Sequence, residues 1–217
     1  MNKLMAATAA FLLSTPSYAG VCVSVEGDDP ACVLDPSYDL EQVFMDAGTD
    51  VNELTGHLGS QTDPRTITFQ SGDLISAAEG FAQITGQSPS GDPGFDDLTF
   101  FMTDPTLGME AVTFDIRAGD ATFLDLFWDS TDGSGSQLNI ALANGLTSFL
   151  MIADPETLTQ VSFQTTDLVD VANFKHLRID PDFITPDPDP VGVDAPGHIA
   201  LLSMGLLGLY SARKRKS

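Results

Sequence analysis

Two short acidic segments hold the residues whose types and spacing suggest ligand chemistry in this 217-residue chain. They are Asp92-Pro93-Gly94-Phe95-Asp96-Asp97 and Asp129-Ser130-Thr131-Asp132-Gly133-Ser134-Gly135. Ca²⁺ takes six to eight oxygen ligands, mainly carboxylates and loop carbonyls. The candidate calcium ligands are therefore Asp92, Asp96, Asp97, Asp129 and Asp132. Neither segment has the spacing of a known calcium loop, so both are first of all turns. No other cofactor is expected.

The histidines and the nucleophile motifs give no support to catalysis. The sequence holds no HExxH, GxSxG, Gly-rich phosphate loop or CxxC. His57 follows Thr55-Gly56 in a predicted loop, and His176 lies in a predicted strand before Arg178, where a surface position is expected. We expect no enzyme activity. A concave pocket that holds one of these histidines beside two carboxylates would argue against this expectation.

Charge is distributed unevenly along the chain. Residues 20–195 contain all 31 acidic residues against four fixed cations, a net charge of −27. These cations are Arg65, Arg117, Lys175 and Arg178. Such a surface repels nucleic-acid phosphates and anionic lipid, so nucleic acid is excluded as a partner. Because the acids are scattered, they are typical of a soluble secreted protein.

The N-terminal residues 1–19 have the pattern of a signal peptide. Lys3 begins the charged region, Met5 to Leu13 is apolar, and Ser17-Tyr18-Ala19 is a small-x-small site. We expect cleavage between Ala19 and Gly20. Export would place Cys22 and Cys32, the only cysteines, where disulfides persist, and their spacing matches no metal or redox motif. A Cys22–Cys32 disulfide is predicted.

The C-terminal residues combine a spacer, an apolar run and a basic end. Residues 181–192 form a Pro/Asp linker, and Ile199 to Tyr210 are twelve mainly apolar residues ahead of a basic cluster that begins at Arg213. A twelve-residue helix is about 18 Å long, against a hydrocarbon core of about 30 Å. We expect a short hydrophobic helix that inserts in the membrane only transiently.

Residues 193–217 combine Val193-Asp194-Ala195-Pro196 with the run Ala200 to Leu209 and the basic end. In these features the tail resembles a PEP-CTERM sorting signal, the substrate of exosortase. The usual Pro-Glu-Pro is Asp194-Ala195-Pro196 here, which is similar to a Val-x-Ala-Pro variant. Val51 to Asp180 loosely resembles the passengers of such tails. The resemblance implies an exosortase-type partner, a location in the cell envelope or outside a Gram-negative cell, and an association with exopolysaccharide. It implies no catalytic residue.

The passenger, residues 20–180, has mainly period-two hydrophobicity. Apolar and polar residues alternate in Val112 to Arg117, Leu138 to Leu142 and Val161 to Thr165, which indicates half-buried strands. About nine such strands in one domain predict an all-β fold, an antiparallel two-sheet β-sandwich of jelly-roll or immunoglobulin-like architecture. The Cys-bearing segment 20–50 is an N-terminal part of it. One short helix is expected over Tyr38 to Asp46, after Asp35-Pro36-Ser37.

One predicted strand bears on binding. Leu124, Leu126 and Trp128 share one face, which we expect in the core, while Phe123 and Phe127 flank Asp125 on the other. The sequence thus indicates an exported acidic protein of the cell surface or matrix with a structural or adhesive role. The alternative is a carbohydrate-binding or calcium-dependent module, in which Phe123, Asp125 and Phe127 would form a contact strip.

Overall fold

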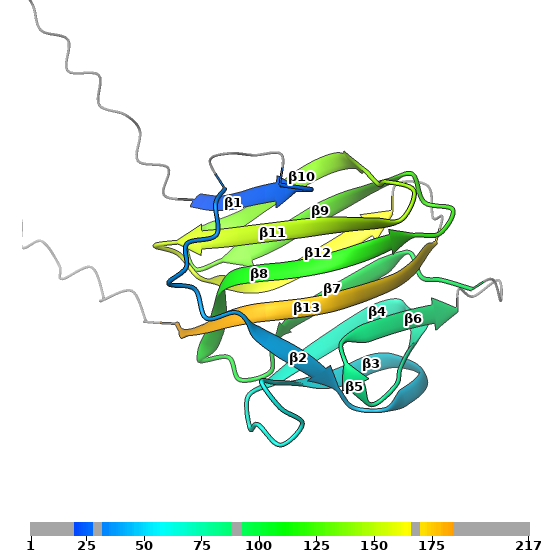
Figure 1. Ribbon diagram of the computed structural model, residues 1–217, viewed down its shortest axis with the longest axis horizontal. Helices are drawn as coiled ribbons and strands as arrows, with labels where there is room; N and C mark the ends of the chain where they lie inside the picture. Colours follow the sequence, from blue (N-terminus) through cyan, green and yellow to red (C-terminus); the bar gives the residue numbers. More distant parts are fainter. Residues whose placement is uncertain (1–19, 28–31, 88–92, 166–169, 185–217) are drawn as a thin grey trace, which may run out of the picture. The chain divides into compact units, whose positions relative to one another are not determined.

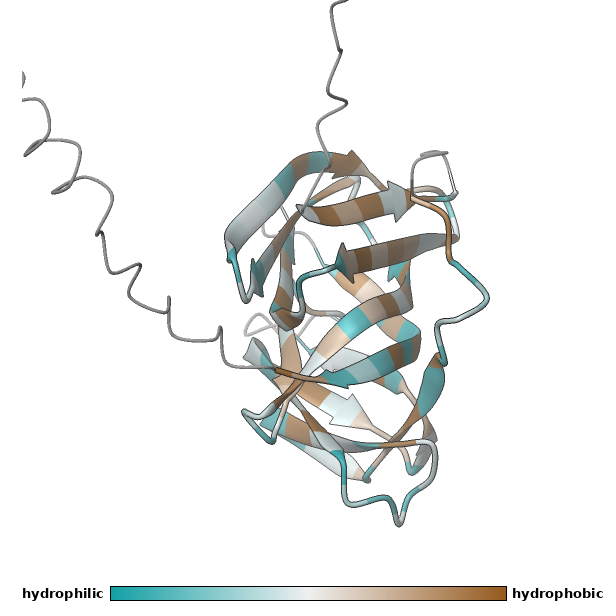
Figure 2. Ribbon diagram, turned by 90° about the vertical axis from the view of Figure 1, so that its left-hand side faces the viewer, coloured by the Kyte–Doolittle hydropathy of each residue, from teal (hydrophilic) through white to brown (hydrophobic). Residues whose placement is uncertain are grey.

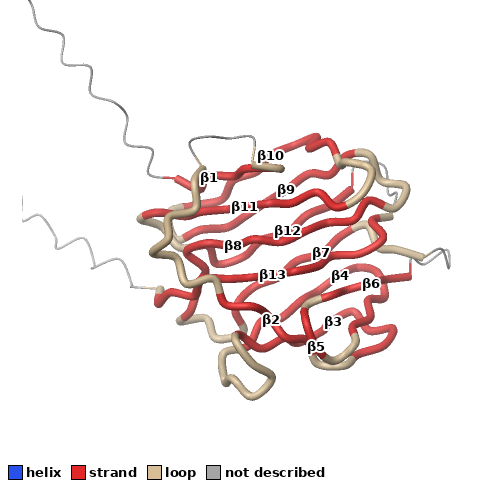
Figure 3. The backbone as a smooth tube through the Cα atoms, viewed as in Figure 1, coloured by secondary structure: helices blue, strands red, loops and turns tan. Residues whose placement is uncertain are grey.

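The computed structural model describes residues 20–27, 32–87, 93–165 and 170–184. These residues form thirteen β-strands and no helix (Figure 3). Within the same residues, no helix has the length and apolarity that a membrane span requires. The predicted signal peptide with Ala19, the linker beyond Ile184, and the sorting motif Val193 to Pro196 lie outside the described residues.

The thirteen strands of the described residues are joined by turns and loops. In chain order they are β1 (Gly20–Val25), β2 (Glu41–Met45), β3 (Gly48–Leu58), β4 (Thr66–Ala77), β5 (Gly80–Phe81), β6 (Gln83–Gln87), β7 (Asp97–Met102), β8 (Leu107–Ala118), β9 (Phe123–Ser130), β10 (Gly133–Ala141), β11 (Leu146–Asp154), β12 (Leu158–Thr165) and β13 (Val171–Phe183). The alternating runs of β8, β10 and β12 are strands, as predicted.

Seven antiparallel strands close into a barrel (Figure 1). Their order is β8-β13-β2-β3-β4-β7-β12, and Leu158 of β12 pairs with Met109 of β8 to complete the circuit. The other strands lie outside it. On one side β11 pairs with β8 and β1 with β11; on the other β9 pairs with β12 and β10 with β9. The short β5 pairs with β2, and β6 pairs with both β13 and β4. The predicted two-sheet sandwich, in either its jelly-roll or its immunoglobulin-like form, is therefore wrong.

Closure depends on strands that change partners along their length. Along one edge, β8 pairs with β12 at Met109 and with β11 from Ala111 to Arg117. Its other partner, β13, has three register shifts against it, and such bulges bend a strand and increase its twist. Alternating hydrophobicity reports which face of a strand is buried, but not which edge pairs with which. The all-β class followed from the sequence, whereas the closure did not.

Aromatic side chains fill the interior. The ring of Phe174 on β13 lies with its centroid 5.3–6.3 Å from those of Phe69, Phe100, Phe114 and Phe163, which come from four other strands. Figure 2 shows apolar and polar segments alternating along the strands, as period-two burial requires. The interior of the barrel is thus an apolar core with aromatic rings from five of its strands.

The expected helix over Tyr38 to Asp46 is wrong. The Asp35-Pro36-Ser37 segment makes a turn, in which the amide of Tyr38 donates to the carbonyl of Asp35 at 3.1 Å. The chain then enters β2, where Val43 and Met45 are both 0% exposed. These two residues have the spacing of a strand, and pairing with β3 and β13 outweighs the local start signal.

The first part of the Cys-bearing segment, β1 and residues 32–40, packs on the outside of the barrel, whereas β2 is one of the barrel strands. Cys32, Ala111 and Ile152 form a small buried cluster, against which Tyr38 and Leu40 pack. The Cα atoms of Cys22 and Cys32 lie 5.6 Å apart, within the range of disulfides. The cysteine pair therefore lies at disulfide distance and joins β1 to the segment that follows it.

Candidate functional site

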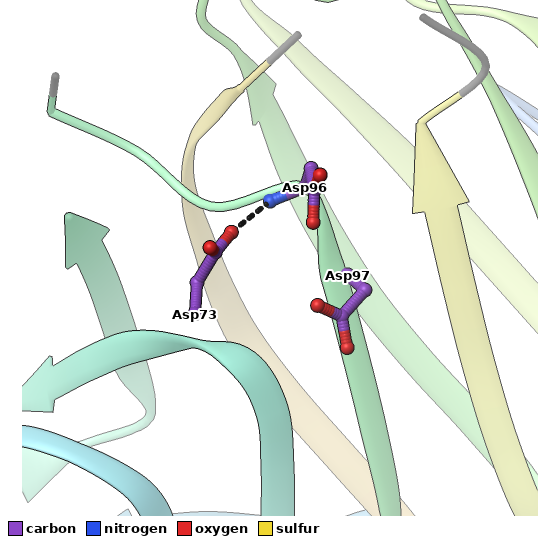
Figure 4. Close-up of side chains that lie close together, drawn as sticks. All are labelled: Asp73, Asp96 and Asp97. Atoms are coloured by element: carbon purple, nitrogen blue, oxygen red, sulfur yellow. Dashed lines mark hydrogen bonds between the residues drawn. The ribbon is translucent and has the colours of Figure 1, made fainter. Parts of the chain in front are cut away.

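Three aspartates converge between β4 and the start of β7. Asp73 lies on β4, Asp96 directly precedes β7, and Asp97 begins it. One carboxylate oxygen from each lies within 4.8 Å of the other two. Figure 4 shows the three carboxylates turned toward one another. We call Asp73, Asp96 and Asp97 the aspartate cluster.

Backbone donors hold the cluster together. The amide of Asp96 donates to Asp73 Oδ2 at 2.8 Å, and the amide of Gly72 donates to both carboxylate oxygens of Asp97 at 3.0 and 3.1 Å. Ser71 Oγ donates to the carbonyl of Asp97 at 2.8 Å and accepts the amide of Asp73 at 3.0 Å. A Ser-Gly-Asp break within β4 thus positions two of the carboxylates.

The electrostatics of the cluster are unfavourable to the fully ionised state. Burial, followed by the charges of Asp73 and Asp97, raises the pKa of Asp96 to about 6. Asp73 is only 4% exposed. Hard divalent cations bind such carboxylate oxygens, and Ca²⁺ would need additional carbonyl or water ligands to reach its usual coordination. The arrangement can hold a cation, but it also occurs in proteins without one.

The structure brings together only part of the predicted calcium set. Asp96 and Asp97 lie in the cluster, and Asp92 lies outside the described residues. Asp129 and Asp132 belong to the β9–β10 hairpin, where Asp129 accepts from Ser134 Oγ at 2.5 Å, so this segment is a turn. Asp73 was missed because it is distant in sequence from Asp96. Its only signal was the polar run Ser71-Gly72-Asp73, which interrupts the alternation of polar and apolar residues in this strand.

His57 is part of a structural network. Its Nδ1 donates to the carbonyl of Asp63 at 2.8 Å, and its Nε2 lies 3.2 Å from Asp46 Oδ2. The carbonyl of Asp63 is the main reason that the pKa of His57 is raised. Both ring nitrogens are therefore engaged, and the ring is not available to a ligand.

His176 lies instead in a groove on the outer face of β1, β11, β8 and β13. The groove has a volume of about 620 Å³. His176 Nδ1 lies 2.7 Å from Asp115 Oδ2, and Ser148 Oγ donates to Asp115 Oδ1 at 2.6 Å. Its φ is +55°, in the left-handed region, at a register shift between β13 and β8. A bulge of this kind re-aims a side chain out of the regular ladder.

The rest of the groove is mixed in character. Arg178 and Thr113 are cross-strand neighbours, and Leu40 and Leu150 supply apolar surface. Asp115 is the one carboxylate among its lining residues. The groove therefore holds a histidine beside one carboxylate, and not beside the two that would have argued for an enzyme. We call these lining residues the outer groove.

The aromatic strip on β9 is open to solvent. Phe123 is 44% and Phe127 37% exposed, while Leu124 and Leu126 are buried. Between the rings, Asp125 Oδ1 accepts the amide of Asn139 at 2.7 Å, so its carboxylate has a partner. The expected burial of Leu124 and Leu126 is confirmed, and the structure shows that the opposite face is open. Trp128 is partly buried against the core.

No protein-family model matches this chain, and no curated protein matches it either.

Proposed function

We propose that this chain is an exported, exosortase-sorted acidic protein of the cell surface or extracellular matrix, with a structural or adhesive role and no catalysis. The observation that carries the proposal is the Cys22–Cys32 pair. These two cysteines lie at disulfide distance directly after the expected cleavage site. Disulfides persist in oxidising compartments, so this geometry supports export. The net charge of −27 over residues 20–195 supports solubility there.

The test is the intact mass and cell fraction of the mature protein in a host with exosortase and in the same strain without it. We expect a chain that begins at Gly20, lacks free thiols, and ends near Val193 to Pro196 only where the enzyme is present. A tail that extends to Ser217 in both strains would contradict the sorting proposal. Two free thiols in the exported protein would contradict the disulfide.

A calcium-dependent binding module is the second candidate, and the aspartate cluster favours it. A divalent cation would favour the ionised form of Asp96, whose pKa is raised first by burial and then by the charges of Asp73 and Asp97. We expect added Ca²⁺ to raise the melting temperature of the wild-type protein, and to have little effect on Asp96→Asn. Asp132→Asn is the matched control, since Asp132 lies outside the cluster. Equal responses of the wild type and Asp96→Asn would exclude this site.

A further inference from the structure

The outer groove contains a positive charge that the fold itself does not use. Within residues 20–184 the fixed cations are Arg65, Arg117, Lys175 and Arg178. Arg65 is engaged by Glu41 and Asp63. Arg178 lines the groove, and among the described residues no carboxylate lies within ion-pair distance of it. In a chain with 31 acids, this is a guanidinium that is open to an external anion.

Next to this cation, the groove presents an oriented acceptor. Asp115 holds Nδ1 of His176 at 2.7 Å, so in the neutral ring the proton lies on Nδ1 and the lone pair on Nε2. Asp115 is itself fixed by Ser148 Oγ at 2.6 Å. The exposed Nε2 of His176 is thus positioned to accept a hydrogen bond from a hydroxyl group.

The shape and the apolar surface complete the pattern. The groove is shallow, it lies across adjacent strands, and Leu40 and Leu150 contribute aliphatic contact area. A pyranose ring offers C–H faces for such contacts and hydroxyls for His176 and Thr113. A carboxylate matches the planar fork of Arg178, which forms paired hydrogen bonds with that group.

We propose that the outer groove binds a carboxylate-bearing sugar, a uronate unit of an acidic polysaccharide, with Arg178 on its carboxylate and His176 on a hydroxyl. The choice of a sugar among carboxylate ligands rests on the proposed surface or matrix role. The carboxylate itself follows from the groove. Because the protein is strongly acidic, a short oligomer should bind better than a long polyanion, whose distant charges are repelled.

The experiment is calorimetric titration of the full mature protein with trigalacturonate at about 0.15 M salt, where the Debye length is about 8 Å. The fully methyl-esterified trisaccharide has the same backbone without the charge and serves as the ligand control. We expect esterification and Arg178→Gln each to weaken binding about tenfold or more, because a charge-assisted pair is lost.

Two further variants separate recognition from folding. His176→Asn removes the imidazole but tolerates the left-handed backbone, and we expect it to weaken binding severalfold. Arg117→Gln removes an equal charge from β8, four residues from Thr113 and outside the groove, and we expect it to bind as the wild type does. Matching circular dichroism spectra would show that the variants fold.

Three outcomes would overturn the proposal: no binding of trigalacturonate at millimolar concentration, equal affinity for the methyl ester, or wild-type affinity in Arg178→Gln. Stronger binding of an acidic peptide than of trigalacturonate would overturn the choice of a sugar. These results are independent of the mass and fractionation test, since a protein with an uncut tail can still bind the trisaccharide, and a correctly sorted one can fail to.

Discussion

Two groups of carboxylates in the barrel have opposite electrostatic surroundings. Glu41 and Asp63 flank Arg65, whose guanidinium donates to Glu41 at 2.6 and 2.8 Å and to Asp63 at 2.8 and 3.0 Å. The side-chain hydrogen bonds of Arg65 lower the pKa of Asp63. In the aspartate cluster, by contrast, the three carboxylates face one another and the pKa of Asp96 is raised to about 6.

The difference shows that a cluster of acidic residues can either stabilise or destabilise the fold. Around Arg65, the cation neutralises two partly buried carboxylates and ties β2 to the loop between β3 and β4. The aspartate cluster is held by backbone amides, which satisfy hydrogen bonds but supply no full charge. When ionised, the carboxylates around Arg65 therefore stabilise the fold, whereas those of the aspartate cluster destabilise it. This is the property that a bound cation would reverse.

Removal of Arg65 should have the largest effect. In Arg65→Gln, Glu41 and Asp63 would repel each other without compensation, and we expect the free energy of unfolding to fall by about 2 kcal/mol at pH 7. Urea denaturation measures it. Arg117→Gln removes an equal charge without breaking an ion pair with a described residue, and should change stability by less than about 0.5 kcal/mol. Equal effects of the two variants would show that only net charge matters.

Neutralisation within the aspartate cluster should have the opposite sign. In Asp96→Asn the like charges of the aspartate cluster are reduced from three to two, and we expect unfolding at pH 7 without calcium to become about 1 kcal/mol less favourable, after allowance for solvent screening. Thermal and urea denaturation measure this gain. A loss of stability in Asp96→Asn would mean that its ionised carboxylate is a required hydrogen-bond acceptor.

The pH dependence should separate the two groups. Because the folded-state pKa of Asp96 is raised, its protonated form favours folding, and stability is lost as the pH rises from about 4 through about 6. The lowered pKa of Asp63 has the reverse effect: its contribution is present above the unfolded value near 3.8 and is lost as the pH falls through the folded value. The advantage of Asp96→Asn over the wild type should therefore vanish near pH 4. An advantage that is independent of pH would contradict this.

The fold was predictable in its class and in its strand faces, but not in its closure. The alternation of Val112 to Arg117 placed Val112, Phe114 and Ile116 inside, where they are. The pairing of Leu158 with Met109, which closes the barrel, joins two residues with no sequence signal for contact. The turn at Asp35-Pro36-Ser37 was mistaken for a helix start because both use the same local hydrogen-bonding residues.

The candidate sites depended even more on pairing. Asp96 and Asp97 were singled out by local density of acids, but Asp73 joins them only because β4 and β7 are neighbours. In the outer groove, Asp115 and His176 meet because of the β8–β13 register. The register shift between Lys175 and Arg178 on β13 brings Arg178 opposite Thr113. Such contacts require strand order and register, which a single sequence does not specify.

The smallest effect is expected at His57. Its Nδ1 donates to the carbonyl of Asp63, which links it to the Arg65 group, and its Nε2 lies beside Asp46. Its pKa is raised, so its contribution is present below about pH 6.5 and is lost as the pH rises through the folded value. We expect wild type to exceed His57→Gln in stability by about 0.5 kcal/mol more at pH 5.5 than at pH 8.5, measured by urea denaturation. Asp46→Asn should reduce this pH-dependent part while leaving the bond to the Asp63 carbonyl. An equal difference at both pH values would show that the ring acts only as a neutral hydrogen-bond donor.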